Sequence, residues 1–371
     1  MKILHINCNY IGTTLHQLMV EELENNGIEN EVFVPTYNKN ISVITPNNNV
    51  CVSECFNKWD RIFFDYKQKK ILEAIENKYD IKSFDMIHAY TLFTDGNVAR
   101  ILSEKYNIPY VVAVRNTDVN DFFRKMFFLR KRGIKTMKKA SAVFFLSNSY
   151  FKDVFDKYIP INDKKEISEK VEIIPNGIDK FWFENRLYQE KNIDLNNIKI
   201  IYAGRIDKNK NIPTTQKALN ILRQEGFNVS LTVVGKVCDK KEFNKICRDG
   251  YTSYIPPVKK EELIEMYRNS DIFVMPSFTE SFGLVYAEAM SQGLPVIYSK
   301  GQGFDGQFEE GKVGKSVDSK NPNSVAEGIK FIIKNYYSMS KNSIEMSRKF
   351  NWKEICDFYI QIYKNILNKD R

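Results

Sequence analysis

Two carboxylates in the second half of the chain have a spacing that suits hydrogen bonding to the hydroxyl groups of a ligand. Glu280 and Glu288 stand eight residues apart around a Ser-Phe-Gly turn at residues 281–283. Apolar residues precede the turn and helix-forming residues follow it, which predicts a strand, a turn and a helix. Glu288 then lies about two turns into the helix. Backbone N–H groups at a helix start attract anions, so one carboxylate suits sugar hydroxyls and the other a ribose diol. The alternative is an ordinary turn with two solvated Glu side chains.

Basic side chains follow another apolar run at residues 200–203. Gly204 and Arg205 come directly after it, and Lys210 lies five residues beyond Arg205. Glycine lets backbone N–H groups approach a phosphate, and the two cations supply fixed positive charge. This turn therefore predicts a diphosphate clamp. Gly12, after the first apolar run, is a similar but weaker candidate.

The elements that must position these residues alternate between apolar runs and amphipathic stretches along the whole chain. This pattern is typical of βα units, and it predicts two doubly wound α/β sheets in tandem, joined near residues 179–197. Ligands of such sheets bind beyond the carboxyl ends of the strands. The expected strands are Lys2–Ile6, Glu31–Val34, Met86–Ala89, Tyr110–Val114, Ala142–Leu146, Val171–Ile174, Ile200–Ala203, Ser230–Val234, Ile272–Met275 and Pro295–Tyr298. The expected helices include Thr14–Asn26, Gly96–Tyr106, Pro213–Gln224, Lys260–Arg268, Leu284–Gln292 and Trp352–Leu367.

Composition narrows the class of protein. The chain has 371 residues, 43% of them hydrophobic, with six Cys and three His. No apolar run approaches the ~18 residues that span a bilayer, and the start reads as a strand and not as a signal peptide. The Cys residues have no metal-ligand spacing, and no Asp-x-Asp pair is present, so we expect a cytoplasmic protein without a metal site.

Part of the net charge of +9 lies in one segment, Phe122–Lys139, which holds eight Lys or Arg and no acid. At 100° per residue its apolar and basic residues fall on opposite arcs, which predicts one amphipathic helix. Aromatic residues opposite a basic face suit an anionic membrane interface, here an inner-membrane surface. The alternative is a core-packed helix with a solvated basic face. The expected membrane contacts are Phe123, Phe127, Lys131, Arg132, Lys135 and Lys138.

Taken together, these motifs resemble the family 4 glycosyltransferases. Glu280 through Glu288, followed by Gly293 and Pro295, looks like the family's Glu-x7-Glu signature, and Gly204-Arg205 with Lys210 looks like its diphosphate-binding residues. Residues 174–179, Ile-Pro-Asn-Gly-Ile-Asp, resemble the turn at its domain junction, and residues 350–352 look like the approach to its terminal helix. The resemblance covers almost the whole second half and is one of outline in the first half.

The resemblance implies the GT-B fold: two Rossmann-like domains facing a cleft, with a C-terminal helix crossing back. The expected domains are an acceptor-side domain at 1–180, a nucleotide-sugar-binding domain at 181–345, and a helix at 346–371 that packs on the first domain. The implied activity is that of a retaining hexosyltransferase. It would move a sugar from a nucleotide diphosphate sugar, with UDP-sugars favoured, to a glycan or polyprenyl-linked acceptor. The implied setting is cell-surface polysaccharide assembly at the cytoplasmic face of the membrane.

The resemblance also implies roles for single residues. Glu280, Arg205 and Lys210 would be catalytic, with no cofactor and no metal, because the nucleotide sugar is itself a substrate. Many family members have His-Gly where this chain has Arg115-Asn116-Thr117-Asp118, so Arg115, Asn116 and Asp118 are expected to contact acceptor or sugar. The donor would be bound by Gly12, Gly204, Arg205, Lys210, Ser281, Phe282, Gly283, Leu284 and Glu288.

Two other classes stay open. A nucleotide-sugar epimerase shares the GT-B fold but lacks the combined Gly-Arg…Lys and Glu-x7-Glu pattern. A basic nucleic-acid-binding protein would fit a pI near 9.0, but a single basic stripe without a recognisable motif disfavours it.

Overall fold

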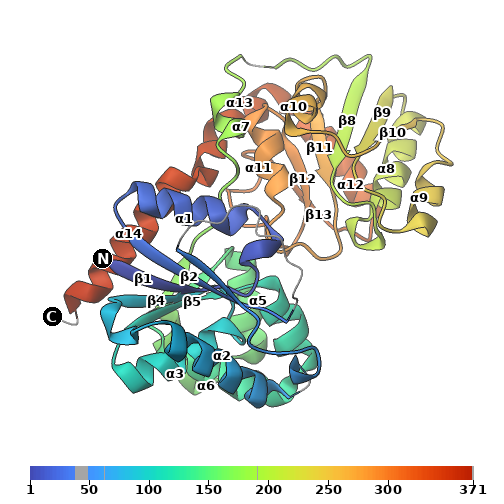
Figure 1. Cartoon of the computed structure of the whole chain (residues 1–371). Helices are drawn as coiled ribbons and strands as arrows, with labels where there is room; N and C mark the ends of the chain where they lie inside the picture. Colours follow the sequence, from blue (N-terminus) through green and yellow to red (C-terminus); the bar gives the residue numbers. More distant parts are fainter. Residues whose placement is uncertain (38–48, 62, 190, 370–371) are drawn as a thin grey trace. The chain divides into compact units, whose positions relative to one another are not determined.

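A computed structural model describes residues 1–37, 49–61, 63–189 and 191–369. The chain forms two compact units (Figure 1). The first comprises Met1–Leu146, Phe151–Asn176 and Trp352–Arg371, and the second comprises Ser147–Tyr150 and Gly177–Asn351.

The first unit is built on a parallel sheet with the strand order β3-β2-β1-β4-β5-β6-β7. Because parallel strands need helical crossovers, helices alternate with them along the chain. The strands are β1 (Lys2–Ile6), β2 (Glu29–Pro35), β3 (Val50–Ser53), β4 (Met86–Ala89), β5 (Tyr110–Val114), β6 (Ala142–Phe145) and β7 (Val171–Ile173). The helices of this half of the chain are α1 (Leu15–Asn25), α2 (Phe64–Lys78), α3 (Asp95–Tyr106), α4 (Arg130–Lys139), α5 (Asn148–Tyr158) and α6 (Ile161–Ser168).

The last helix, α14 (Trp352–Lys369), packs against α1 in the first unit. Its apolar face joins a core cluster with Ile3, Met19 and Phe144. The Tyr363 hydroxyl lies 2.7 Å from Nδ1 of the buried His88. A long amphipathic helix gains stability by covering such an apolar surface.

The second unit is a parallel sheet with the order β10-β9-β8-β11-β12-β13. Two parallel, Rossmann-like sheets confirm the predicted fold class. The strands are β8 (Ile198–Ala203), β9 (Val229–Val234), β10 (Thr252–Ile255), β11 (Ile272–Met275), β12 (Val296–Ser299) and β13 (Gly314–Val317). The helices are α7 (Phe181–Glu184), α8 (Ile212–Gln224), α9 (Lys240–Ile246), α10 (Lys260–Arg268), α11 (Leu284–Ser291), α12 (Pro322–Lys334) and α13 (Tyr336–Met346).

The segment Phe122–Lys139 is not the single helix that its periodicity predicts. A π-helical turn spans Asp118–Phe123, a 3-10 turn spans Phe127–Leu129, and α4 begins only at Arg130. The chain bends because Phe123 enters the core, where its ring stacks on that of Tyr158 at 5.1 Å. Phe123 is therefore 0% exposed and cannot contact a membrane, whereas Phe127 is 71% exposed.

The basic side chains of this segment also do not form the purely positive face that the sequence predicts. Arg132 pairs with Asp65 of α2, and Lys138 pairs with Asp163 of α6. Lys135 lies 3.8 Å from Glu104 of α3. Acids far away in sequence thus neutralise part of the face that looked uniformly positive. No helix in the described part of the chain is long and apolar enough to cross a bilayer.

Candidate active site

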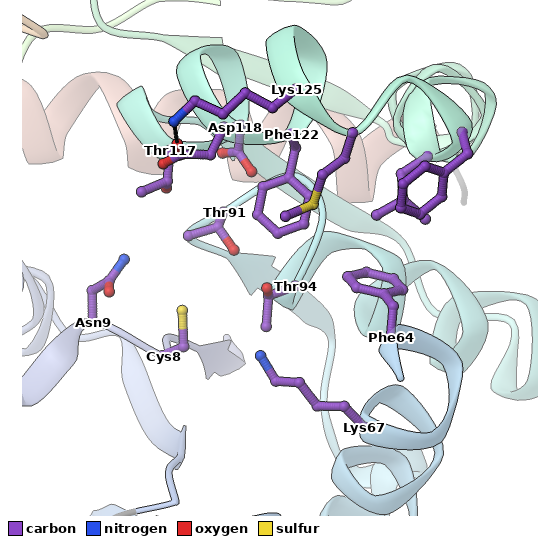
Figure 2. Close-up of a pocket in the computed structure, with 14 residues that line it drawn as sticks. Cys8, Asn9, Phe64, Lys67, Thr91, Thr94, Thr117, Asp118, Phe122 and Lys125 are labelled. Carbon is purple, nitrogen blue, oxygen red and sulfur yellow. Dashed lines mark hydrogen bonds and ion pairs between the residues drawn. The ribbon is translucent and has the colours of Figure 1, made fainter. Parts of the chain in front are cut away.

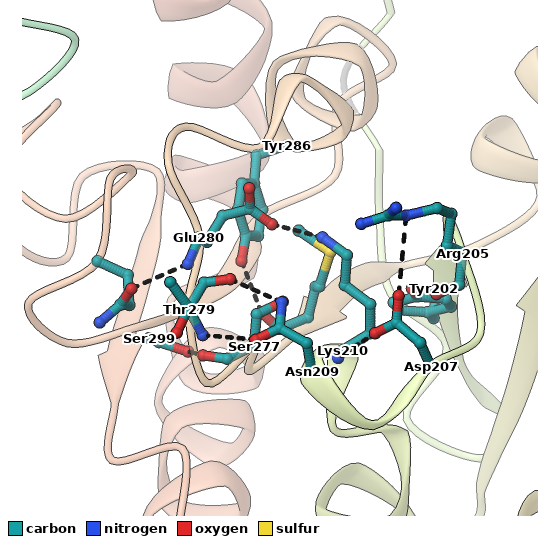
Figure 3. A network of polar contacts seen from close by, with 12 residues as sticks. Tyr202, Arg205, Asp207, Asn209, Lys210, Ser277, Thr279, Glu280, Tyr286 and Ser299 are labelled. Atoms are coloured by element: carbon teal, nitrogen blue, oxygen red, sulfur yellow. Dashed lines mark hydrogen bonds and ion pairs between the residues drawn. The ribbon is translucent and has the colours of Figure 1, made fainter. Parts of the chain in front are cut away.

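Three loops meet at the carboxyl edge of the second sheet, after the neighbouring strands β8, β11 and β12. The first loop carries Gly204 through Lys210, the second carries Glu280, and the third carries residues 300–303. Adjacent parallel strands end side by side, so residues 70 positions apart in sequence come into contact. Figure 3 shows these loops converging.

The centre of this site is an ion pair between Lys210 and Glu280. Lys210 Nζ lies 2.5 Å from Glu280 Oε2, and the two side chains are only 13% and 11% exposed. Lys210 ends a short 3-10 helix at Lys208–Lys210, whose preceding residue Asp207 accepts a hydrogen bond from the Lys210 N–H. A largely desolvated charge pair of this kind is costly to bury and needs further polar support.

Neighbouring side chains supply that support. Asn209 donates from Nδ2 to the Thr279 carbonyl at 2.8 Å and accepts the Thr279 N–H at 3.0 Å. On the other side, the Glu280 N–H donates to Gln302 Oε1 at 2.9 Å. The Gly303 N–H donates to the Glu280 carbonyl at 2.7 Å. The backbone of the Glu280 turn is thereby held from both flanking loops.

Sequence reasoning missed Asn209 and Gln302, since an isolated Asn or Gln in a loop has no distinguishing pattern. The only available signal was their position, because Asn209 lies inside the Gly-Arg…Lys loop and Gln302 inside the turn after β12. Their partners lie 70 and 22 residues away, so only the folded chain reveals the contacts.

Arg205 lies at the rim of the site. Its side chain is 69% exposed, with Nε 3.7 Å from Asp207 Oδ2. The Tyr202 hydroxyl donates to the Arg205 carbonyl, which fixes the backbone of the loop and leaves the guanidinium at the surface (Figure 3). An exposed pair at this distance is weak, so the guanidinium is available to an anion.

The loop's close packing explains its glycines. Gly204 has a φ of +148°, and a Cβ on Gly235 would lie 1.8 Å from the Gly204 carbonyl oxygen. The ends of β8 and β9 therefore approach more closely than any side chain permits.

The residues of the Ser-Phe-Gly turn were predicted to bind the donor, and they differ in how deeply they are buried. The Phe282 side chain is buried and its ring packs against that of Phe350, so it belongs to the core. Gly283 has a φ of +79° and immediately precedes α11, which starts at Leu284. The first N–H groups of a helix have no partner within it, so this turn presents donors to an anion.

Glu288 lies in the middle of α11 and is half-buried. Burial, and then the negative charge of Asp179, raise the pKa of its carboxyl to about 7. Among the described residues, no side chain or backbone group donates a hydrogen bond to this carboxylate. The carboxylate oxygens of Glu288 are thus available to accept hydrogen bonds from a ligand.

The other predicted contacts lie in the first unit. Gly12 ends a 3-10 turn at Tyr10–Gly12, and Arg115 donates from Nη1 to Asn176 Oδ1 at 3.0 Å. Asn116 accepts a hydrogen bond from the Asn120 side chain. Asp118 is fully buried, and burial raises the pKa of its carboxyl to about 6. Its oxygens accept the backbone N–H groups of Leu92, Phe93 and Arg115, so the carboxylate ties two loops of this unit together.

Family models match both halves of the chain. The model described as "Glycosyl transferases group 1" matches residues 183–350, and "Glycosyltransferase Family 4" matches residues 13–180. The D-inositol 3-phosphate glycosyltransferase of Paenarthrobacter aurescens is 26% identical over 216 residues, 54% of this chain and 53% of the relative. The chain thus spans about half the length of that relative. A 41.2 kDa uncharacterized protein in the cps region of Klebsiella pneumoniae is 26% identical over 302 residues, 76% of this chain and 79% of that protein.

Solved structures share the architecture over the whole chain. Sucrose-phosphate synthase from Thermosynechococcus elongatus superposes with a TM-score of 0.76 at 18% identity, covering 100% of both chains. HepE from Anabaena, in complex with UDP and glucose, superposes with a TM-score of 0.68 at 16% identity, covering 98% of this chain and 100% of the other. At these identities the likeness concerns the fold. Together with both family models, it defines the class: the chain has the GT-B architecture, and each half matches a glycosyltransferase family model.

Proposed function

We propose that this protein is a glycosyltransferase that moves a sugar from a UDP-sugar to a glycan or lipid-linked glycan, with retention of the anomeric configuration, in cell-surface polysaccharide assembly. The observation that carries the proposal is the largely buried Lys210–Glu280 pair, with Arg205 at its rim and the start of α11 beside it. UDP as the nucleotide is supported by HepE, a structural neighbour solved with UDP and glucose. The pathway is supported by the relative in a cps region.

The chemical demand is a leaving diphosphate that gains negative charge as the glycosidic bond breaks. Lys210, Arg205 and the N–H groups at the start of α11 would stabilise that charge through contacts that strengthen in the transition state. Lys210 donates a hydrogen bond to Glu280, so each charge has the other as its partner. A donor would separate their roles, with the phosphates taking Lys210 and the sugar hydroxyls taking Glu280.

Glu280 serves better as a hydroxyl acceptor than as a nucleophile. Its carboxylate is already engaged by Lys210, and its backbone is held from two sides. The acceptor oxygen would bond to the anomeric carbon on the face from which the diphosphate leaves, which gives retention, and the departing phosphate oxygen would take the proton of the acceptor hydroxyl. Proton NMR of the product checks this, because an anomeric configuration opposite to that of the donor would contradict it.

UDP binding is expected to tighten as pH rises through neutrality, because Glu288 must be ionised to accept both hydroxyls of the ribose. Burial raises the pKa of its carboxyl to about 7, so ionisation costs free energy below that pH. Calorimetric titration of UDP between about pH 6 and pH 8 measures the effect. The UDP phosphate titrates nearby, so the readout is the ratio of dissociation constants between Glu288→Gln and wild type. If the dissociation constants of the two proteins change with pH in the same way, Glu288 does not bind the ribose.

The same carboxyl has an opposite effect on folding. Burial raises its folded-state pKa above the ordinary value of 4.5, so the folded state favours the protonated form. That contribution to stability is lost as pH rises through about 7. Glu288→Gln should therefore melt at a higher temperature than wild type at alkaline pH, which also controls for misfolding of the variant.

Transfer is expected to continue in excess EDTA. Fixed cations at Arg205 and Lys210 would neutralise the diphosphate, and among the described residues no group of three or more His, Cys, Asp or Glu could hold a metal ion. Initial rates with and without EDTA should agree. Complete loss that manganese or magnesium restores would show that a metal performs this neutralisation.

We also propose that the enzyme works on the anionic cytoplasmic face of the membrane. Phe127 and Phe128 are 71% and 69% exposed, and the neighbouring Arg124 and Lys131 are exposed as well. Aromatic rings with adjacent cations suit an anionic interface, where each cation contributes about 1 kcal/mol. Arg132 and Lys138 are ion-paired and fit this role less well.

Charge reversal at Arg124 and Lys131 is expected to release the protein from phosphatidylglycerol vesicles in a sedimentation assay. The matched control reverses Lys240 and Lys259, two exposed lysines of the second unit, and so changes the net charge equally. Binding should also weaken with salt without vanishing, since salt screens only the charges. If both double variants sediment with the vesicles to the same extent, this segment does not bind the membrane.

The overall proposal is tested with a panel of nucleotide sugars, scored first by thermal stabilisation and then by transfer to membrane lipid extracts. UDP-sugars should stabilise the protein and label a lipid fraction. Stabilisation by other nucleotides alone would overturn the donor, and conversion of the sugar without transfer would indicate an epimerase.

A further inference from the structure

A groove of about 610 Å³ lies between α8 and α9 in the second unit, and no predicted donor residue lines it. One wall is a face of α8, where Pro213, Gln216, Lys217 and Asn220 recur at helical spacing. The other wall is formed by α9 and the turn 247–251 that leads into β10 (Figure 1). The volume is that of a small-molecule site, and most of the lining side chains are polar.

Tyr251 forms an aromatic platform in this groove. The residue is 62% exposed, yet the guanidinium of Arg223 lies only 4.0 Å from the centroid of its ring. That guanidinium is itself fixed, because it donates to the Val229 carbonyl at 3.1 and 2.9 Å and to Asn220 Oδ1 at 2.7 Å. The cation–π contact therefore holds the ring in one orientation while most of it stays exposed. An exposed ring held in this way suits the C–H face of a sugar.

Gln216 adds a fixed polar group to the lining. It is only 6% exposed, and its Nε2 donates to the Ile246 carbonyl at 2.8 Å and to Thr252 Oγ1 at 3.0 Å. These bonds orient the amide, and no described group donates to its Oε1. Asn220 lies one turn further along α8, is exposed, and has its Oδ1 occupied by Arg223. Oε1 of Gln216 can thus accept from a ligand hydroxyl, and Nδ2 of Asn220 can donate to one.

The groove carries an excess of positive charge. Its lining has one acid, Asp249, and three cations, Lys217, Lys245 and Arg248. Lys245 pairs with Glu242 and Asp249 pairs with Arg223, so these two contacts leave the excess unchanged. Within the described residues, Lys217 and Arg248 form no ion pair, and both are exposed. Two cations without an acidic partner favour an anionic ligand over a neutral one.

The larger cavity of the first unit differs in this respect. Its volume is about 730 Å³, and Figure 2 shows Lys67 and Lys125 in its lining. Two acids of the same lining, Asp118 and Asp121, balance these cations. An anion therefore gains more from the groove between α8 and α9, where cations outnumber acids.

We propose that this groove binds an acidic glycan, with one sugar ring stacked on Tyr251 and its carboxylate held by Lys217 and Arg248. Hydroxyls of the same sugar bond to Gln216 and Asn220. Single-stranded nucleic acid also presents anions and rings, but it is held by several aromatic side chains in succession, and this lining has one. The groove shares no residue with the donor loops. Binding there holds the enzyme on an acidic polysaccharide between transfers.

The test uses trigalacturonate, a trisaccharide of uronic acids, in calorimetric titration at low salt without a nucleotide sugar. Wild type should bind it, and should bind its trimethyl ester, which keeps the rings without the charges, at least about tenfold more weakly. Tyr251→Ser should also weaken binding about tenfold, because the stacking platform is lost. Tyr188→Ser is the matched control, since Tyr188 is an exposed ring beside the Arg186 guanidinium that does not line the groove.

The double change Lys217→Gln with Arg248→Gln should weaken binding of trigalacturonate about tenfold and leave binding of the ester unchanged. Lys320→Gln with Lys334→Gln removes the same charge from exposed positions of the same unit and should have no effect. All the changed side chains are exposed, so the melting temperatures should match that of wild type.

Equal binding of the acid and its ester by wild type would overturn the proposal. Unchanged binding in Tyr251→Ser, or equal weakening in the control variants, would overturn it as well, because the glycan would then lie elsewhere. Tighter binding of a thymidine tetranucleotide than of trigalacturonate would mean that the groove is a nucleic-acid site. UDP titration of the same proteins separates the two proposals: loss of UDP binding in wild type refutes the donor assignment and leaves the glycan result standing.

Discussion

Replacing Glu280 with Gln is expected to slow sugar transfer about 100-fold, equivalent to ~3 kcal/mol of transition-state stabilisation. The amide keeps the size of the side chain but loses the charge that strengthens its bonds to sugar hydroxyls. It also leaves Lys210 without its counter-charge in a site where both side chains are nearly buried. Initial rates with a UDP-sugar and a lipid extract measure the effect.

The control for this change is Glu309→Gln, which removes the same charge from an exposed loop of the same unit. Its rate should match that of wild type. If Glu280→Gln also transfers at the wild-type rate while folding normally, the sugar does not lie at the Lys210–Glu280 pair. Arg205→Ala should cost a similar factor, since it removes a cation from the diphosphate.

Gly303→Ala is expected to reduce transfer by about 100-fold or more, although residue 303 carries no reactive group. A Cβ at this position would lie 1.8 Å from the Ser281 carbonyl oxygen, which is backbone and cannot rotate away. The turn that holds Glu280 must shift instead, and the bond from the Gly303 N–H to the Glu280 carbonyl would be strained. Misplacing a catalytic group by about 1 Å costs roughly this factor.

Gly250→Ala is the matched control, because nothing lies within 4 Å of the added Cβ. It should leave both the rate and the melting temperature unchanged. Hydrogen exchange of the 279–285 backbone would then rise in Gly303→Ala alone. A fully active Gly303→Ala enzyme would show that the Glu280 turn tolerates displacement, and that its close packing on the third loop has no part in catalysis.

The sequence by itself determined the class of fold, since central strands buried on both faces must be mostly apolar. β1, β5, β8 and β11 were therefore predictable. The edge strand β7 was also expected, but the edge strands β3, β10 and β13 were not, because a strand with one neighbour is short and half polar, as in Gly314–Val317. Most candidate donor residues could be named because they stand in turns after predicted strands, and Glu288 because it lies eight residues beyond Glu280 in the helix that follows.

Tertiary structure alone decided which of these residues meet. The Lys210–Glu280 contact joins positions 70 residues apart, and the supporting bonds of Asn209 and Gln302 have no local signature. The segment Phe122–Lys139 shows that even a clear sequence pattern does not determine the path of the backbone. Its periodicity suits a helix with one apolar face, yet Phe123 is buried while Phe127 is exposed. Periodicity records which side chains are apolar, whereas the packing of Phe123 on Tyr158 determines where the backbone bends.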